Sequence, residues 1–280
     1  MKKATITLSL IIILLLAHNL QAKDMFRYNY TKGDTLSYAI SITSDLKFNE
    51  LGNLAALLNI EKIMHNVEMD VDLIGKTVKS NGNFQIKVLF KRISMIMIAG
   101  DSVFVDNGEK WGVVRPGSTY EIELTPRGQY VGVNSGDTVG ARQVVQMVQR
   151  FFPVMPDKLI DPNYSWSDSV SFEVELPNQP PVMIFTNMTY GFTGLESDDN
   201  KGHANFNYDA TGNSNGEDQI SLTGKGDLAF DNQRGRVVDN NGQFVLDAEV
   251  NLSMFGLPSG MGTTPVNIDS QIKIKLNHAE

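Results

Sequence analysis

A histidine-based catalytic triad in this chain would have to involve His65. His278 lies near the end of the sequence, and His203 lies in a polar segment. His65 alternates in phase with Val67 and Met69, a spacing typical of a strand face directed at a core. No Gly-x-Ser-x-Gly motif supplies a nucleophile beside it. We therefore expect His65 at the edge of a core, and we expect neither catalytic residues nor enzymatic activity.

Three carboxylates, Glu68, Asp70 and Asp72, occupy every second position of the same segment. On a strand they lie on one face about 7 Å apart, which is too far to share a proton and wide for a common metal ion. The spacing therefore favours a solvated outer face over an acid–base pair.

A short acidic segment offers oxygen ligands of the kind that calcium prefers, from Asp198, Asp199 and Asn200. Lys201 intrudes, however, and Gly202 falls one place short of the EF-hand spacing. We predict the tip of a hairpin here, with a calcium site as the alternative.

Methionines are frequent near the predicted strands, and thioethers such as those of Met95 and Met97 could bind copper. No His or Cys lies nearby in sequence, so we expect neither a metal site nor a cofactor. Residues 93–98 are almost all apolar, which requires cover on both faces or a cavity. Methionine adapts to irregular apolar contacts. We predict that an apolar ligand contacts Met69, Val71, Met95, Met97, Val144, Val148 and Phe151.

The first 22 residues have the pattern of a secretory signal peptide. Lys2 and Lys3 precede an apolar run over 4–17, and Ala22 provides a small residue for cleavage. The run is shorter than the roughly 20 residues of a membrane anchor, which is the alternative. Cleavage after Ala22 would leave 23–280 as a single β-rich domain.

Composition limits the location and the partners of this domain. The chain contains no cysteine, so it lacks the residue that carries the lipid of a bacterial lipoprotein, and its formal net charge is −8. This charge disfavours nucleic acid and anionic membrane surfaces as partners. We predict a soluble periplasmic or secreted protein that is not an integral membrane protein.

Alternating apolar and polar residues dominate the rest of the sequence, as in strands with one buried face. The alternation recurs over 35–48, 67–73, 84–90, 244–252 and 272–276. Turn signals occur at Ser80-Asn81-Gly82, Pro126-Arg127-Gly128 and Asn240-Asn241-Gly242. We predict an all-β, mainly antiparallel fold. Because several strands are longer than the usual 5 or 6 residues, we expect a large curved sheet or half-barrel.

One segment, 138–152, instead repeats apolar residues at spacings of three and four and is followed by Pro153. We predict an amphipathic helix there. A lone helix of this length needs an apolar surface, so we expect it to pack on the concave face of the sheet. Residues 49–59 form a weaker candidate for a short helix or an apolar loop.

Several motifs resemble those of an uncharacterised family of exported bacterial β-rich proteins. They are the segments 28–38 and 120–128, Phe151-Phe152-Pro153 with Tyr164-Ser165-Trp166, Gly224-Lys225-Gly226-Asp227 with Phe230-Asp231, and Gly235-Arg236-Val237-Val238. By fold analogy the chain is also similar to the half-barrel with a helical lid of periplasmic lipoprotein carriers and related lipid-binding proteins. This resemblance implies a lipid-binding fold and brings no catalytic residues.

Two functions follow as expectations. The first is an envelope carrier or binding protein that holds a lipid or acyl chain between the curved sheet and the helix. The second is a structural or protein-interaction module that binds an envelope protein through strand edges or its acidic face.

Overall fold

The structure is a computed structural model of the 280-residue chain. The described residues are 25–48, 62–107, 114–133, 138–174, 182–198, 201–214, 220–251 and 262–279. The predicted signal peptide, the candidate helix over 49–59, and Asp199 and Asn200 of the acidic segment lie outside these ranges.

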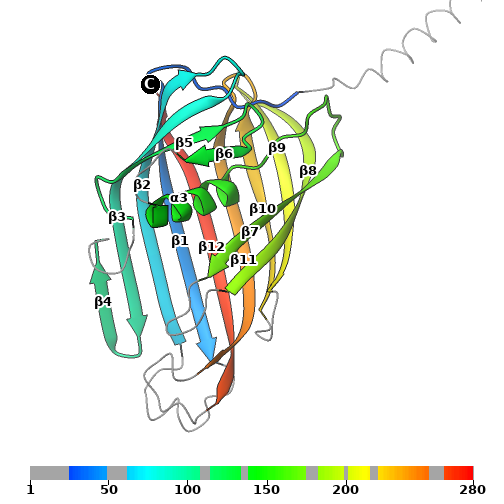
Figure 1. The fold of residues 1–280 in the computed structure, drawn as a ribbon. Helices are drawn as coiled ribbons and strands as arrows, with labels where there is room; N and C mark the ends of the chain where they lie inside the picture. Colours follow the sequence, from blue (N-terminus) through cyan, green and yellow to red (C-terminus); the bar gives the residue numbers. More distant parts are fainter. Residues whose placement is uncertain are drawn as a thin grey trace, which may run out of the picture.

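The strands form one antiparallel sheet of twelve strands that curves around the only helix of the described ranges (Figure 1). The elements are β1 (Thr35–Phe48), β2 (Lys62–Val78), β3 (Phe84–Ala99), β4 (Ser102–Asp106), β5 (Thr119–Leu124), β6 (Tyr130–Val133), α3 (Thr138–Phe151), β7 (Ser165–Val174), β8 (Val182–Asp198), β9 (Lys201–Ser214), β10 (Ser221–Asp231), β11 (Arg236–Asn251) and β12 (Thr263–Ala279). Their order is β6-β5-β3-β2-β1-β12-β11-β10-β9-β8-β7, and β4 pairs with β3. The predicted fold class is confirmed.

The alternation of apolar residues sets the two faces of this sheet. Leu36, Tyr38 and Ile40 of β1 are buried in one apolar cluster with residues of α3. They therefore lie on the concave side of the sheet, which α3 crosses in Figure 1 and which we call the inner face. Tyr38 pairs with Val71 of β2 and with Leu276 of β12, so apolar residues lie side by side across the strands. The predicted turns at 80–82 and 126–128 join β2 to β3 and β5 to β6.

The turn predicted at Asn240-Asn241-Gly242 is wrong, because these residues lie inside β11. Gly242 pairs with Gly226 of β10, and the Tyr208 hydroxyl of β9 donates a 3.0 Å hydrogen bond to the side chain of Asn240. The glycine makes room for the Tyr208 ring on the inner face, and Asn240 anchors its hydroxyl. The Asn-Gly pair therefore marks a close contact between β11 and a side chain of β9, and not a turn.

We expect Gly242→Ala to destabilise the protein by about 1–3 kcal/mol, because the new methyl group would overlap the Tyr208 hydroxyl and the Phe244 ring. Gly202→Ala is the matched control, since nothing lies near the methyl group that it adds on β9. Urea unfolding of both variants measures the difference. Equal effects would show that Tyr208 does not depend on this space.

The predicted helix is confirmed as α3, which connects the edge strand β6 to the opposite edge strand β7. In Figure 1 it crosses the concave side of the sheet. Its buried residues Ala141, Val144 and Val148 belong to the same apolar cluster as Tyr38 on the inner face. The backbone of α3 approaches the two edge strands β6 and β7, and also β5, which lies beside β6. The helix therefore bridges the two edges as well as covering part of the inner face.

The segment before β1 crosses the upper end of the half-barrel in the view of Figure 1. Phe26, Tyr28 and Tyr30 are almost completely buried, and the Tyr28 amide donates a 2.7 Å hydrogen bond to the Pro126 carbonyl. The Phe26 ring lies 5.0 Å from that of Phe192 and 5.1 Å from that of Phe206. This end of the inner face is therefore a packed core.

Candidate functional site

Below the packed core, the inner face carries twelve adjacent residues that are only partly buried. We call them the inner strip. They form three rows across β3, β2, β1 and β12: Met95, Val67, Ile42 and Ile272; Met97, His65, Ser44 and Ser270; and Ala99, Ile63, Leu46 and Ile268. At ordinary strand spacings the strip measures about 14 Å by 14 Å. Nine of its twelve side chains are apolar, so it offers a partly exposed apolar surface.

The middle row of the inner strip is polar. Ser44 lies between His65 on β2 and Ser270 on β12, and the hydroxyl groups of the two serines are 2.9 Å apart. Ser44 is the polar exception among the apolar residues that share its phase of β1, and Ser270 shares its phase of β12 with apolar residues and with the buried Thr264. His65 lies between Ile63 and Val67 in its phase of β2. These polar residues are visible in the sequence, but only the register shows that the three are neighbours.

The residues predicted to contact a ligand divide into two groups. Met69, Met95 and Met97 are partly buried on the inner face, and the two last belong to the inner strip. Val71, Val144 and Val148 are at most 2% exposed and belong to the packed core under α3. The side chain of Phe151 lies outside the described part of the structure. The space between helix and sheet is thus filled by protein at these valines, and the inner strip is the accessible apolar surface beside it.

Burial lowers the pKa of the His65 imidazole below its ordinary value, and no hydrogen bond from a described residue opposes this effect. In the unfolded chain the imidazole has a pKa of about 6.5. Between the lowered pKa of the folded protein and the pKa of the unfolded chain, the unfolded chain binds more protons than the folded protein. The free energy of unfolding therefore decreases as the pH falls through this range.

We therefore expect the free energy of unfolding to decrease between pH 7.5 and pH 5.5, and His65→Gln to reduce this decrease. Urea unfolding at both pH values is the measurement. His203→Gln is the control, because His203 lies on the outer face of β9, next in sequence to the inward-facing Ala204. If both variants reduce the decrease equally, burial of His65 is not its cause.

The three carboxylates of β2 lie on the outer face, as predicted, but they form ion pairs with β3. Asp70 lies 2.8 Å from Arg92, Asp72 lies 2.9 Å from Lys91, and Glu68 lies 3.6 Å from Arg92. Asp72 is also buried and accepts a 2.6 Å hydrogen bond from Ser37. These ion pairs link β2 to the neighbouring strand β3. Among the described residues, no group of three His, Asp or Glu side chains could hold a metal ion.

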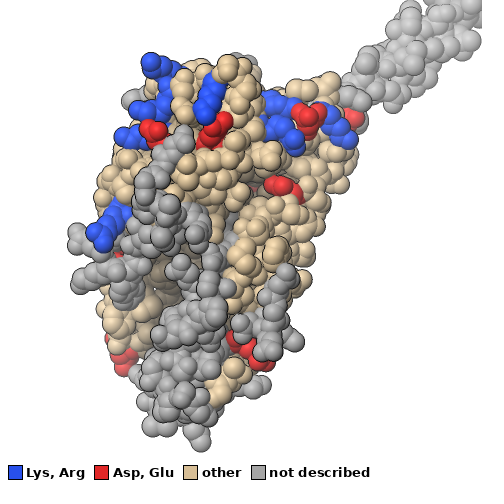
Figure 2. All heavy atoms as spheres, viewed as in Figure 1, with Lys and Arg blue, Asp and Glu red and all other residues tan. Residues whose placement is uncertain are grey.

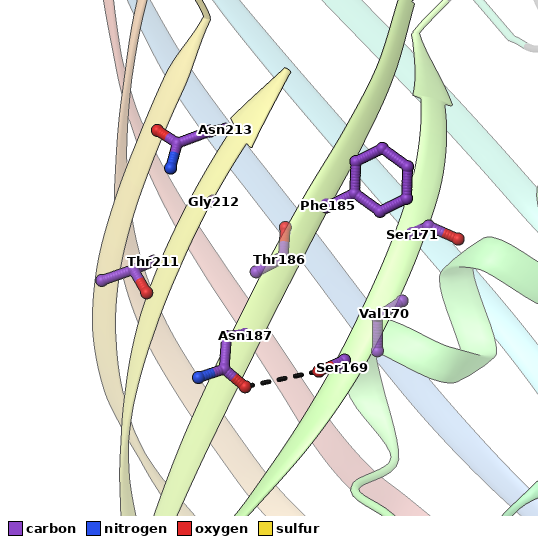
Figure 3. A pocket seen from close by; sticks show the side chains of 9 residues that line it. All are labelled: Ser169, Val170, Ser171, Phe185, Thr186, Asn187, Thr211, Gly212 and Asn213. Carbon is purple, nitrogen blue, oxygen red and sulfur yellow. Dashed lines mark hydrogen bonds between the residues drawn. The ribbon is translucent and has the colours of Figure 1, made fainter. Parts of the chain in front are cut away.

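A hollow of about 380 Å³ crosses β7, β8 and β9 (Figure 3). Its walls are uncharged: Ser169, Val170, Ser171, Phe185, Thr186, Asn187, Thr211, Gly212 and Asn213. The Ser169 hydroxyl donates a 3.4 Å hydrogen bond to the Asn187 side chain. With no titratable group in its walls, this hollow offers neither an acid–base pair nor an ion pair to a ligand.

Most of the Lys and Arg side chains visible in Figure 2 lie at the upper end of the molecule. Within the described ranges, no helix has both the length and the apolarity needed to cross a membrane.

No family model and no curated protein matches the chain, so the family resemblance stays a prediction. Among solved structures, the chain is similar to lipovitellin, in a structure that describes lipid–protein interactions. The TM-score is 0.54 at 10% sequence identity, and the alignment covers 90% of this chain. It covers 26% of the lipovitellin chain, so this chain spans about a quarter of that protein's length. At this identity the similarity concerns the fold.

Proposed function

We propose that this protein binds an apolar ligand, a lipid or acyl chain, on the inner strip of its curved sheet. The observation that carries the proposal is the difference in burial along the inner face. The upper half is packed by α3 and by the segment that holds Phe26, whereas the strip below keeps nine apolar side chains partly exposed. A contiguous apolar surface inside a concave wall is typical of a ligand site.

The similarity to lipovitellin supports this proposal at the level of the fold, since the lipovitellin structure describes lipid–protein interactions. We further propose that the signal peptide exports the chain to the periplasm or beyond, where it acts as a carrier or binding protein without enzymatic activity. In this proposal the ligand lies on the inner strip, beside the filled space under α3.

Two measurements test the proposal. Native mass spectrometry of protein purified from its own envelope should detect a bound lipid. Titration of the purified protein with pyrene, a hydrocarbon probe, should give saturable fluorescence enhancement, because pyrene offers only apolar surface. A ligand-free mass with a stoichiometric protein partner, together with no pyrene binding, would favour an interaction module and overturn the carrier function.

A further inference from the structure

The inner strip has a polar centre, which a site for pure hydrocarbon does not need. His65, Ser44 and Ser270 form one continuous row on three neighbouring strands. Apolar rows flank it on both sides: Val67, Ile42 and Ile272 above, and Ile63, Leu46 and Ile268 below. Side chains directly opposite each other on adjacent strands have Cβ atoms about 4.5–5.5 Å apart, so the three polar groups can act on one ligand group.

The hydrogen bonds within this row leave donors unused. The two serine hydroxyls share one hydrogen bond of 2.9 Å, and one of the two O–H groups must be the acceptor in it. The hydrogen of that accepting hydroxyl has no acceptor among the described residues. Neutral His65 carries one N–H donor and has no hydrogen bond with a described residue. Two donors of the row therefore have no acceptor among the described residues, and the other side chains of the inner strip are apolar.

We propose that the ligand is a monoacyl amphiphile whose head group, a carboxyl or an ester, places its two oxygens on the His65–Ser44–Ser270 row while its chain lies on the flanking apolar residues. This inference rests on the proposed function. Donors left unpaired next to an apolar ligand would weaken its binding, whereas two acceptor oxygens satisfy both of them. The row therefore selects an acyl chain with a polar head over a plain hydrocarbon.

The experiment compares two probes on the full-length mature protein: pyrene, which has no acceptor, and decanoic acid, which competes with it. The variants are His65→Leu and the double variant Ser44→Ala/Ser270→Ala. We expect each variant to lower the affinity for decanoic acid at least about tenfold, which corresponds to the loss of one to two hydrogen bonds. The affinity for pyrene should stay the same or rise, because pyrene has no acceptor for the donors that the variants remove. The controls are His203→Leu and Ser41→Ala, which make the same changes on the outer face.

The outcomes are distinct. A selective loss of decanoic acid binding in the row variants, absent from the outer-face controls, supports the inference. If pyrene binds and the row variants change both probes equally or neither, the head-group role is overturned while the apolar site stands. If neither probe binds the parent protein, the proposed function itself fails. Circular dichroism checks that each variant is folded. If His65→Leu does not fold, the double variant Ser44→Ala/Ser270→Ala still tests the inference.

Discussion

Replacing Met97 with tryptophan is expected to abolish pyrene uptake while the protein remains folded. Met97 lies in the polar row of the inner strip, on β3, between His65 on β2 and Phe104 on β4. Its side chain is partly exposed, so a larger indole can be accommodated by filling the space that the ligand would occupy. We expect the affinity for pyrene to fall at least about tenfold in fluorescence titration, which corresponds to about 1.4 kcal/mol.

The neighbouring substitution Ile96→Trp is the matched control. Ile96 is the next residue on the same strand, and alternation places its side chain on the outer face, opposite Asn66 and Val105. Both variants add the same indole to β3, but only one adds it to the proposed site. Loss of pyrene binding in Ile96→Trp with normal binding in Met97→Trp would place the ligand on the other face of the sheet.

The second large effect concerns stability. Phe26→Ala is expected to lower the free energy of unfolding by about 3–5 kcal/mol, because it removes a buried ring and leaves a cavity. The Phe26 side chain is 1% exposed and makes edge-to-face contacts with Phe192 and Phe206. Urea unfolding of the mature protein is the measurement.

Met25→Ala is the control for this prediction, because Met25 is 45% exposed and adjacent in sequence. Its substitution should change stability by no more than about 0.5 kcal/mol. If Phe26→Ala were equally mild, the segment before β1 would not be part of the core, and the upper end of the inner face would not be closed by it.

The fold class was predictable because the period of two is a local property. Leu36, Tyr38 and Ile40 alternate with polar residues whatever their partners are, and the apolar spacing of α3 is equally local. The turn predicted at Asn240-Asn241-Gly242 shows the limit of this reasoning. Asn and Gly favour turns, yet here the glycine makes room for Tyr208 and the asparagine binds its hydroxyl. That contact depends on β9, about thirty residues away in sequence.

The site was less predictable, because burial along one strand depends on what covers it. Val67 and Val71 occupy the same phase of β2, but Val71 is sealed in the packed core and Val67 is partly exposed. Nothing local distinguishes these two valines. The polar row illustrates the same difficulty, since Ser44 and Ser270 become neighbours only through the pairing of β1 with β12.

That pairing also has a consequence for how the molecule assembles. β1 to β6 form one run of strands next to each other in sequence, β7 to β12 form another, and the two runs are hydrogen-bonded to each other through β1 and β12. The central seam therefore joins residues nearly a full chain length apart, such as Ile40 and Ile274. Closing so long a loop costs entropy before its contacts form. We therefore expect the strands within each run to pair first and β1 to pair with β12 last. Transition-state mapping by substitution would then give φ-values near zero at Ile40 and Ile274, whereas high values there would make the seam the nucleus of folding.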